Sequence, residues 1–254
     1  MKTFRKSLLS FLSSFDEWEL VESKPFPSDF DFYFSPQHKI YIHLVECDKR
    51  LNKISPTFFQ ESSLFAFKQN IKLLHIREEQ WLEKPEFIKS RLESIFETNT
   101  KIHARQCKIR RIEKLEYDEF MNKHHMLQTA KTKFKFGLFK GEVLLAVMGI
   151  SGGRWMTKET DLRKSFEIIR FASVSNITVV GGFSKLLKHI ENELNVEEWM
   201  SYFDLDFVSS NVYKRLGFEI KSVTKVQQKP IPNSELLTYT SGNLKLIKRI
   251  HAKK

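Results

Sequence analysis

The chain has 254 residues, a formal net charge of +11 at pH 7, two cysteines and 41% hydrophobic residues. This composition excludes a disordered chain and a disulfide-stabilised secreted domain, and no segment reaches the about 18 uncharged apolar residues that span a membrane. Cys47 and Cys107 fit a reducing compartment. We expect a cytoplasmic, nucleoid-associated protein without a membrane segment.

The positive charge is confined to one part of the chain. Residues 1–102 contain 15 Lys/Arg and 15 Asp/Glu, whereas residues 103–254 contain 27 and 16. The length favours two domains, so the sequence predicts a neutral domain followed by a basic one. A basic domain indicates a polyanionic partner, most often nucleic acid, with an anionic membrane surface or solubility alone as alternatives. We therefore predict DNA as the partner.

The neutral part is predicted to alternate between helices and strands. The expected elements are an amphipathic helix within residues 1–20, strands over 29–34 and 39–46, a helix over 56–69, a strand over 72–76 and a helix over 84–97. Pro85 suits the first turn of the last of these helices, where its missing N–H is not needed. Residues 101–112 are a strand-like connector, and we place the domain boundary within it.

The basic part is predicted to contain a hairpin and a strand-turn-helix unit. The expected elements are a helix over 114–127, strands over 134–140 and 142–151, a polar loop over 152–161, a strand over 165–173, a strand-turn-helix over 176–190, a strand over 197–207 and a short helix over 209–220. Gly141 is expected to close the hairpin, and Gly217 to stop the last helix. Residues 227–254 are expected to form a basic tail.

Gly181 and Gly182 stand where an apolar strand becomes a Lys/Leu helix. Such a pair can simply allow a turn, because glycine adopts backbone angles that are closed to other residues. It can also hold a phosphate, because the first N–H groups of a helix have no partner inside the helix. The residues themselves leave both interpretations open.

The order of elements in the basic part resembles the GNAT acyltransferase fold. The most specific match is the segment SNVYKRLGF (210–218), which is similar to the Asn and the Y-x-x-L-G-F sequence near the end of GNAT domains. The resemblance implies acetyl-CoA or a related acyl donor. It also implies that Tyr213 lies near the reacting thioester and protonates the leaving thiolate, with a plain core tyrosine as the alternative.

A narrower similarity covers residues 72–223 well and the earlier residues weakly. The runs FEIIRFA (166–172), VVGGFSKLLK (179–188) and SYFD (201–204) resemble phage and mobile-element proteins. In those proteins a GNAT domain akin to the phage Mu DNA-modification protein Mom follows a Vsr/homing-endonuclease-like domain.

This resemblance implies an α/β (α+β) chain of two domains. The implied parts are a restriction-endonuclease-like, Vsr-like domain over residues 1–102, a Mom-like GNAT domain over 103–226 and a basic C-terminal tail over 227–254. The implied activity is modification of a DNA base at the exocyclic amine of adenine.

The acyl donor is expected at the turn that contains the two glycines. The GNAT pyrophosphate loop follows Q/R-x-x-G-x-G/A, which aligns with VVGGFS (179–184). The residues that the resemblance assigns to donor binding are Val180, Gly181, Gly182, Ser184, Lys185 and Asn211. Val179 replaces the Gln or Arg of the family, so the glycines indicate where a donor would lie without indicating which donor it is.

The same resemblance gives four candidates for the active centre, namely Asp204, Tyr213, Arg170 and His125. Asp204 could accept a proton from the exocyclic amine, and Arg170 could bind a phosphate or form a plain ion pair with Asp204. The run HHMLQ (124–128) resembles the family's N-H-x-Q element. His125 could therefore be a base or a DNA contact, with an exposed helix-end residue as the alternative.

The N-terminal domain retains only part of an endonuclease site. Such a site needs acidic residues to hold Mg²⁺ and a His or Lys to handle protons. The resemblance places Asp31 at the metal-binding position, with His43 and Glu46 on the second strand, but FFQESS (58–63) replaces the Tyr-His pair and the Lys. We expect a degenerate domain, in which Mg²⁺ binds only under the alternative of an active metal-dependent endonuclease.

Cations and exposed apolar side chains are expected to contact the DNA. The candidates for phosphate contacts are Arg105, Lys108, Arg110, Arg111, Lys131, Lys133 and Lys135. A base must leave the duplex before its amine reacts, so Trp155 and Met156 in the polar loop could stack on bases or wedge between them. A solvated basic surface with one tucked Trp is the alternative.

The sequence therefore predicts a DNA-acting, GNAT-type transferase with a degenerate endonuclease-like domain. The alternatives are an active endonuclease that the GNAT domain targets, a non-catalytic DNA-binding protein of a mobile element, and an ordinary protein or small-molecule acetyltransferase.

Overall fold

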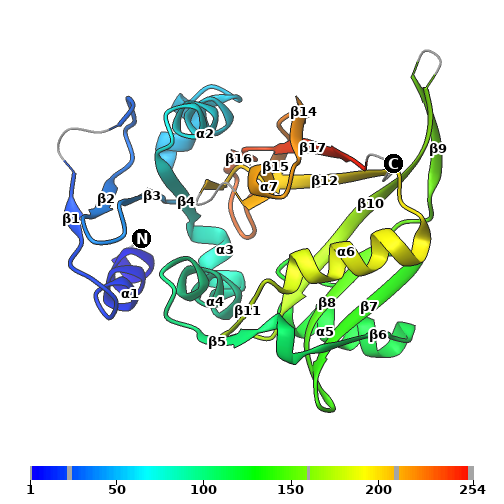
Figure 1. Cartoon of the computed structure of the whole chain (residues 1–254). Coiled ribbons are helices and arrows are strands. Elements are labelled where there is room, and N and C mark those ends of the chain that lie inside the picture. Colours follow the sequence, from blue (N-terminus) through cyan, green and yellow to red (C-terminus); the bar gives the residue numbers. More distant parts are fainter. Residues whose placement is uncertain (1, 22–24, 159–160, 209–211, 251–254) are drawn as a thin grey trace. The chain divides into compact units, whose positions relative to one another are not determined.

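The structure is a computed structural model that describes residues 2–21, 25–158, 161–208 and 212–250 (Figure 1). The chain forms two compact units. The first unit comprises Met1–Lys89, Phe203–Asn211 and Ser222–Leu244, and the second comprises Ser90–Tyr202, Val212–Lys221 and Lys245–Lys254. The units interleave along the sequence, in contrast to the one boundary near residue 102 that the sequence indicates, because the chain returns to the first unit twice.

The first unit is built on a five-stranded mixed sheet. The strand order is β1-β2-β3-β4-β13, with bounds Glu19–Leu20, Phe32–Ser35, Ile40–Val45, Lys72–Arg77 and Phe207–Val208. β3 and β4 run parallel, and the other neighbours are antiparallel. The central strands are largely buried, as their continuous apolar runs predict.

The helical elements of the first unit are α1 (Lys2–Leu12), η1 (Lys49–Lys53), α2 (Phe58–Lys68), α3 (Glu78–Glu83) and the start of α4 (Pro85–Ile95). Phe30, Val45, Phe59 and Ile231 share one apolar cluster of the core. Ile231 is 4% exposed although it belongs to the predicted tail. That segment instead contains the antiparallel pair β15 (Gln228–Pro230) and β16 (Leu237–Tyr239).

The second unit is built on a larger sheet with the order β14-β17-β12-β10-β8-β7-β6, and β9 pairs with the start of β10. The strands are β6 (Lys108–Arg111), β7 (Phe134–Lys140), β8 (Val143–Ile150), β9 (Arg154–Lys158), β10 (Asp161–Ser173), β12 (Glu198–Asp204), β14 (Glu219–Val223) and β17 (Asn243–Arg249). β12, β14 and β17 carry residues of both units.

Two long helices belong to the second unit. α5 (Lys114–His124) buries Tyr117 in a cluster with Val147 and Ala172 of the sheet. α6 (Gly182–Leu194) buries Leu186 and Ile190. The remaining elements are the parallel pair β5 (Thr100–His103) and β11 (Ile177–Val180), the turn η2 (Ala104–Gln106) and the short helix α7 (Val212–Arg215).

Many predicted elements of this mixed α/β chain are confirmed. Gly141 has a φ of +61° at the turn between β7 and β8, and Gly217 has a φ of +81° directly after α7. Pro85 is the first residue of α4, and both cysteines are free thiols. Among the described residues, no helix combines the length and the apolar character that crossing a bilayer requires.

Three predictions about local structure are wrong. The polar loop over 152–161 contains β9, which has no period-two pattern because Arg154, Trp155 and Met156, which alternate between its two faces, are all exposed. The strand over 197–207 is two strands, β12 and β13, which join different sheets. The predicted tail contributes β15, β16 and β17, because Ile231, Leu244 and Leu246 are buried.

Candidate functional site

The double glycine forms the turn between β11 and α6. Gly181 precedes the helix with φ +76° and ψ 7°, a left-handed conformation that residues with a Cβ rarely adopt. Gly182 is buried, and a Cβ there would lie 3.1 Å from Val179 and 3.3 Å from Leu138. Backbone conformation therefore explains the glycine at position 181, and close packing explains the glycine at position 182. The turn places the first N–H groups of α6 next to the end of β11.

The side chains around this turn are committed to the protein itself. Ser184 Oγ donates to Gly181 O at 3.0 Å. Lys185 Nζ donates to Ala104 O at 2.9 Å and to Cys107 O at 2.6 Å, so its charge is held by carbonyl groups. An anion at this helix end would thus be bound mainly by backbone N–H groups.

Val179, which replaces the family's Gln or Arg, and the predicted donor-site residues Val180 and Asn211 lie in different surroundings. Val179 is 8% exposed, which explains an apolar residue where the family has Gln or Arg, because a long polar side chain would have to leave the core. Val180 is 39% exposed next to the turn. Asn211 lies outside the described residues.

β10 and β12 separate close to this turn. They pair in parallel only from Ser165 with Glu198 to Glu167 with Met200. An irregularity between Ile168 and Arg170 follows, and β10 continues to Ser173 while pairing with β8. Over the described part of both strands, their parallel pairing ends at Glu167 and Met200, so their facing edges open.

Tyr213 lies beside this opening. Its ring packs on Phe183, in the first turn of α6, at 5.7 Å between centroids, and Phe183 packs on Phe171 of β10 at 5.0 Å. The phenol hydrogen-bonds with the buried Ser201 of β12. Burial raises the pKa of Tyr213, opposed by that hydrogen bond and by the charge of Arg91. Tyr213 is therefore a protonated phenol at neutral pH.

His125 and Arg170 also lie near each other. Burial lowers the pKa of His125 to about 4, and the charges of Arg170 and Arg91 act in the same direction. The Leu127 N–H donates to His125 Nδ1 at 3.1 Å, so the neutral ring carries its proton on Nε2. This tautomer makes His125 a hydrogen-bond donor rather than the base that the sequence allowed.

Arg170 is fixed by carbonyl groups, and Arg91 adds a second cation. Arg170 donates from Nε to Gln128 O at 3.3 Å and from Nη1 to Ile169 O at 2.9 Å. Arg91 acts electrostatically on both His125 and Tyr213. Sequence reasoning missed Arg91, because its helix was placed in the other domain and no motif marks it.

Asp204 has contacts within its own unit. It belongs to the first unit, whereas Arg170, His125 and Tyr213 belong to the second. Its Oδ1 accepts the N–H of Asp206 at 3.0 Å, and its charge acts on the buried Arg77. The contacts of Asp204 thus support the local backbone of the first unit.

The predicted DNA-binding cations lie along β6, β7 and the adjoining segments. Arg110 makes two hydrogen bonds to Glu142, at 2.8 and 2.9 Å, and Arg111 pairs with Glu193 at 2.5 Å. Lys135 Nζ approaches Thr132 O at 3.4 Å. The exposed residues Arg105, Lys108, Lys131 and Lys133 complete the set. Because β6 is the last strand of the sheet, these cations gather at a sheet edge.

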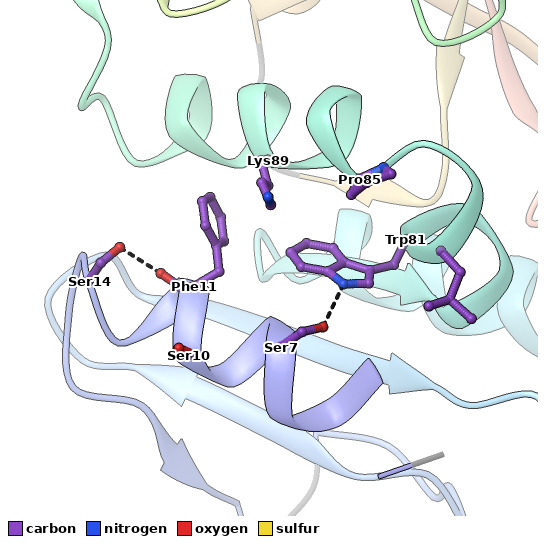
Figure 2. A pocket seen from close by; sticks show the side chains of 8 residues that line it. Ser7, Ser10, Phe11, Ser14, Trp81, Pro85 and Lys89 are labelled. Carbon is purple, nitrogen blue, oxygen red and sulfur yellow. Dashed lines mark hydrogen bonds between the residues drawn. The ribbon is translucent and has the colours of Figure 1, made fainter. Parts of the chain in front are cut away.

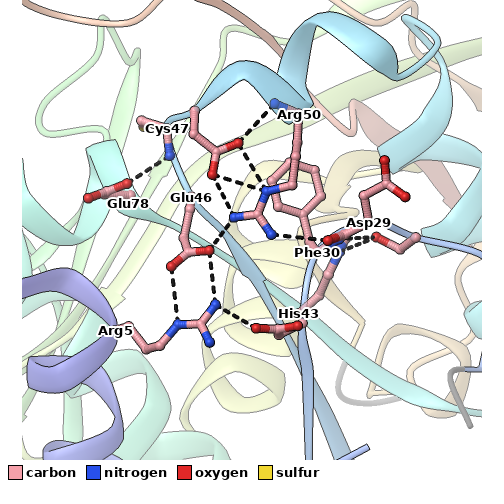
Figure 3. Close-up of polar contacts among 11 residues, drawn as sticks. Arg5, Asp29, Phe30, His43, Glu46, Cys47, Arg50 and Glu78 are labelled. Carbon is pink, nitrogen blue, oxygen red and sulfur yellow. Dashed lines mark hydrogen bonds and ion pairs between the residues drawn. The ribbon is translucent and has the colours of Figure 1, made fainter. Parts of the chain in front are cut away.

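The two carboxylates predicted to bind a metal ion, Asp31 and Glu46, are paired with arginine side chains instead (Figure 3). The Arg5 guanidinium lies 2.5 Å from Asp31 and 3.0 Å from Glu46, and Arg50 also pairs with Glu46. Among the residues that the structure describes, no three His, Cys, Asp or Glu side chains form a group that could hold a metal ion. Arginine thus neutralises both carboxylates.

A cavity of about 620 Å³ lies elsewhere in the first unit (Figure 2). Its lining residues are Ser7, Ser10, Phe11, Ser14, Trp81, Leu82, Pro85 and Lys89. Trp81 Nε1 donates to Ser7 Oγ at 2.8 Å, and Lys89 pairs with Glu86. No sequence-predicted site residue lines it.

No protein-family model and no curated protein matches the chain. Among solved structures, it is similar to the ribosomal-protein-S18-alanine N-acetyltransferase from Escherichia coli, with 13% identity and a TM-score of 0.39 over 58% of this chain and 96% of that one. A GNAT family acetyltransferase from Elizabethkingia anophelis with acetyl-CoA bound has 10% identity and a TM-score of 0.36 over 57% of this chain and 99% of that one. A Bacillus subtilis acetyltransferase in complex with CoA has 14% identity and a TM-score of 0.35 over 57% of this chain and 99% of that one. At this level of similarity, function has to be inferred from the residues of the chain itself.

Proposed function

We propose that the second unit is a GNAT-type acyltransferase that moves an acyl group from an acyl-CoA donor to an amine. The observation that carries the proposal is the separation of β10 and β12 beside the first turn of α6, with the protonated phenol of Tyr213 next to both. The GNAT resemblance of the segment VVGGFSKLLK (179–188) and of SNVYKRLGF (210–218) points to the same chemistry.

The opening suits a donor that has a diphosphate and a chain of amide groups. The start of α6 is the positive end of a helix dipole and offers N–H groups to an anion. Gly181 leaves this end accessible, because a Cβ there would meet no atom nearer than 3.9 Å. The facing edges of β10 and β12 can bond amide groups in the way that a sheet edge bonds an added strand.

Tyr213 suits the role of general acid. When an amine attacks the thioester carbonyl, a C–N bond forms and the C–S bond breaks. The departing thiolate takes up a proton, and the acylated nitrogen releases one to the solvent. A phenol whose pKa is raised by burial keeps its proton until that step, and the Ser201 hydrogen bond stabilises the phenolate that results. Arg91 adds positive charge near Tyr213, and both Arg91 and Arg170 add it near His125.

The proposed acceptor is DNA, at the exocyclic amine of adenine. The support is the location of the whole net charge of +11 after residue 102, together with the cations along β6 and β7. Such an amine is reached only after the base leaves the stack, at a cost of a few kcal/mol. Phosphate contacts from a basic sheet edge offset that cost.

The first unit is proposed to be a nuclease-like scaffold with no working metal site. The support is the pairing of Asp31 and Glu46 with Arg5. The Mg²⁺-dependent endonuclease alternative receives no support from this arrangement.

The test compares Tyr213→Phe with the unaltered protein. Thiol release from acetyl-CoA and longer acyl-CoAs is measured with DNA present, and donor affinity is measured by calorimetry. Loss of the proton donor should reduce thiol release about 10²- to 10⁴-fold, with donor affinity nearly unchanged because the ring remains. Tyr239→Phe, on β16, is the matched control and should leave thiol release unchanged.

Nucleoside mass spectrometry of DNA from expressing cells then identifies the acceptor. An altered adenosine that disappears in Tyr213→Phe is expected. Donor-dependent thiol release without altered nucleosides would retain the acyltransferase and overturn DNA as its acceptor. No thiol release with any acyl-CoA would overturn the proposal as a whole.

A further inference from the structure

We propose that the hairpin of β9 and the start of β10, here named the β9–β10 arm (residues 154–158 and 161–165), binds unpaired, single-stranded DNA. The inference deepens the proposed function, on which its choice of DNA rests. The arm carries three exposed large apolar side chains, with Trp155 63%, Met156 51% and Leu162 56% exposed. By contrast, Trp81 is 4% and Trp199 0% exposed. Apolar side chains gathered on a solvated ribbon indicate a surface that is covered by a partner.

The register of the hairpin places a cation beside two of the three exposed apolar side chains and pairs the third, Leu162, with Thr157. Trp155 is paired with Lys164, and Met156 is paired with Arg163. Directly paired residues point to the same face, so Trp155 and Lys164 share one face, and Met156 and Arg163 share the other. Arg154 adds an exposed cation next to Trp155 in sequence.

This distribution fits a nucleic-acid strand better than a lipid surface. An element that lies on a membrane gathers its apolar side chains on one face and its cations on the opposite one. In the β9–β10 arm, both faces combine an apolar group with a cation. Single-stranded nucleic acid offers that same combination, because each base has an apolar face and each phosphate a negative charge.

The exposed indole of Trp155 indicates that the arm binds unpaired bases rather than a duplex. Stacking on Trp155 needs a free base face, which a duplex hides between neighbouring base pairs. β10 continues from the arm at Asp161 to Ser173, past Phe171 of the candidate site. At roughly 3.3 Å per residue, Lys164 and Phe171 are about 23 Å apart along the strand, so the arm would hold DNA away from the reacting base.

The test uses the fluorescence of the full-length protein. A short oligothymidylate is titrated in low salt, alongside a duplex and alongside anionic phosphatidylserine vesicles. The oligothymidylate is expected to quench the emission of the exposed Trp155. Trp155→Ala should weaken its binding about 5- to 100-fold and remove the quenching, and Trp155→Phe should lie between the two.

Matched variants separate stacking from charge. Arg154→Gln with Lys164→Gln should weaken binding and make its salt dependence shallower by about 1.4 in the log–log slope, at about 0.7 per lost contact. Leu115→Ala and Lys68→Gln, at exposed positions outside the arm, should change nothing. Circular dichroism and urea unfolding establish that each variant is folded.

Three results would overturn the proposal. These are oligothymidylate binding that Trp155→Ala leaves unchanged, duplex binding that is tighter and equally sensitive to Trp155→Ala, and a Trp155 emission shift with vesicles but not with DNA. The readout needs no acyl donor, so Tyr213→Phe should bind the oligonucleotide normally. Oligonucleotide binding without any acyl transfer would support the role of the arm and overturn the proposed acyltransferase. Acyl transfer without oligonucleotide binding would overturn only the role of the arm.

Discussion

Two arginines, one in each unit, make nearly the same contacts in different surroundings. Arg77 lies 2.9 Å from Asp206, and Arg110 lies 2.8 Å from Glu142. Each guanidinium makes two hydrogen bonds to its carboxylate and lies over a phenylalanine ring. The side chains of the first pair are 2% and 12% exposed, and those of the second are 42% and 85% exposed.

The comparison teaches that burial, rather than contact geometry, separates a structural charge from an available one. Arg77 also donates to Thr238 and Ser241, so its guanidinium is hydrogen-bonded to other groups inside the protein. Water or a phosphate can replace Glu142 at Arg110 at little cost, because both side chains are already hydrated. The same contact thus belongs to the core in one unit and to a potential binding surface in the other.

The largest effect is expected at the buried pair. Asp206→Ala leaves the Arg77 guanidinium buried without its carboxylate and should lower the free energy of unfolding by about 3–5 kcal/mol. Urea denaturation measures this. Glu142→Ala, at the exposed pair, is the control and should leave the urea midpoint unchanged.

A double replacement sharpens the result. Arg77→Met with Asp206→Leu removes both charges and should recover most of the lost stability, because apolar residues of similar volume can replace a buried ion pair. Equal stability of Asp206→Ala and Glu142→Ala would contradict the role given to burial.

The second largest effect on stability is expected on acidification, through protonation of His75 beside the buried pair. Burial lowers the pKa of His75 to about 4, and the charge of Arg77 lowers it too, although Asp206 opposes this. His75 Nε2 lies 3.0 Å from Ser63 Oγ, which donates to Leu205 O, so His75 Nδ1 is the acceptor facing His43 at 2.8 Å. The chain of hydrogen bonds therefore needs a neutral His75.

The sign follows from the two pKa values. The unfolded chain binds the proton near pH 6.5 and the folded chain only near pH 4, so stability is complete above pH 6.5 and falls as the pH drops toward 4. The loss should reach about 3 kcal/mol. Urea midpoints between pH 7 and 4 measure it, and His75→Gln should flatten that part of the profile. An unchanged slope in His75→Gln would assign the acid loss to other groups.

The smallest effect is expected at the exposed pair, and it concerns binding. Glu142→Gln removes the carboxylate that holds Arg110 and should free this cation for a phosphate. Affinity for DNA in low salt should rise, with a salt dependence steeper by about 1 in the log–log slope. Filter binding at several salt concentrations measures it, and Glu61→Gln, an exposed residue of α2, is the control. A rise of equal size in both variants would show a general charge effect.

Prediction from sequence succeeded where the signal is local. The apolar periods of α5 and α6, the turn glycines Gly141 and Gly217, and Pro85 at the start of α4 depend only on near neighbours. It failed at β9, whose exposed faces carry no alternation, and at β13, which joins β4 from a distant part of the chain. Long-range pairing of a two-residue strand leaves no local pattern.

Two parts of the candidate site could be predicted from sequence motifs, namely the turn that contains the two glycines and Tyr213. The contribution of Arg91 was not, since it comes from a helix without a motif. His125 was found as a residue but not as a tautomer, which depends on the Leu127 N–H. Lys185 was expected to bind an anion, and only the fold shows two carbonyl groups beside its ammonium.

The pairing of β4 with β13 has a consequence for synthesis of the chain on the ribosome. Arg77 and β4 emerge long before Asp206 and β13, by on the order of ten seconds at roughly 5–20 residues per second. During that interval, β4 has an open edge and Arg77 has no buried counter-ion, a state prone to pair with other chains. The nascent first unit is therefore a candidate client for chaperones until the later segment arrives.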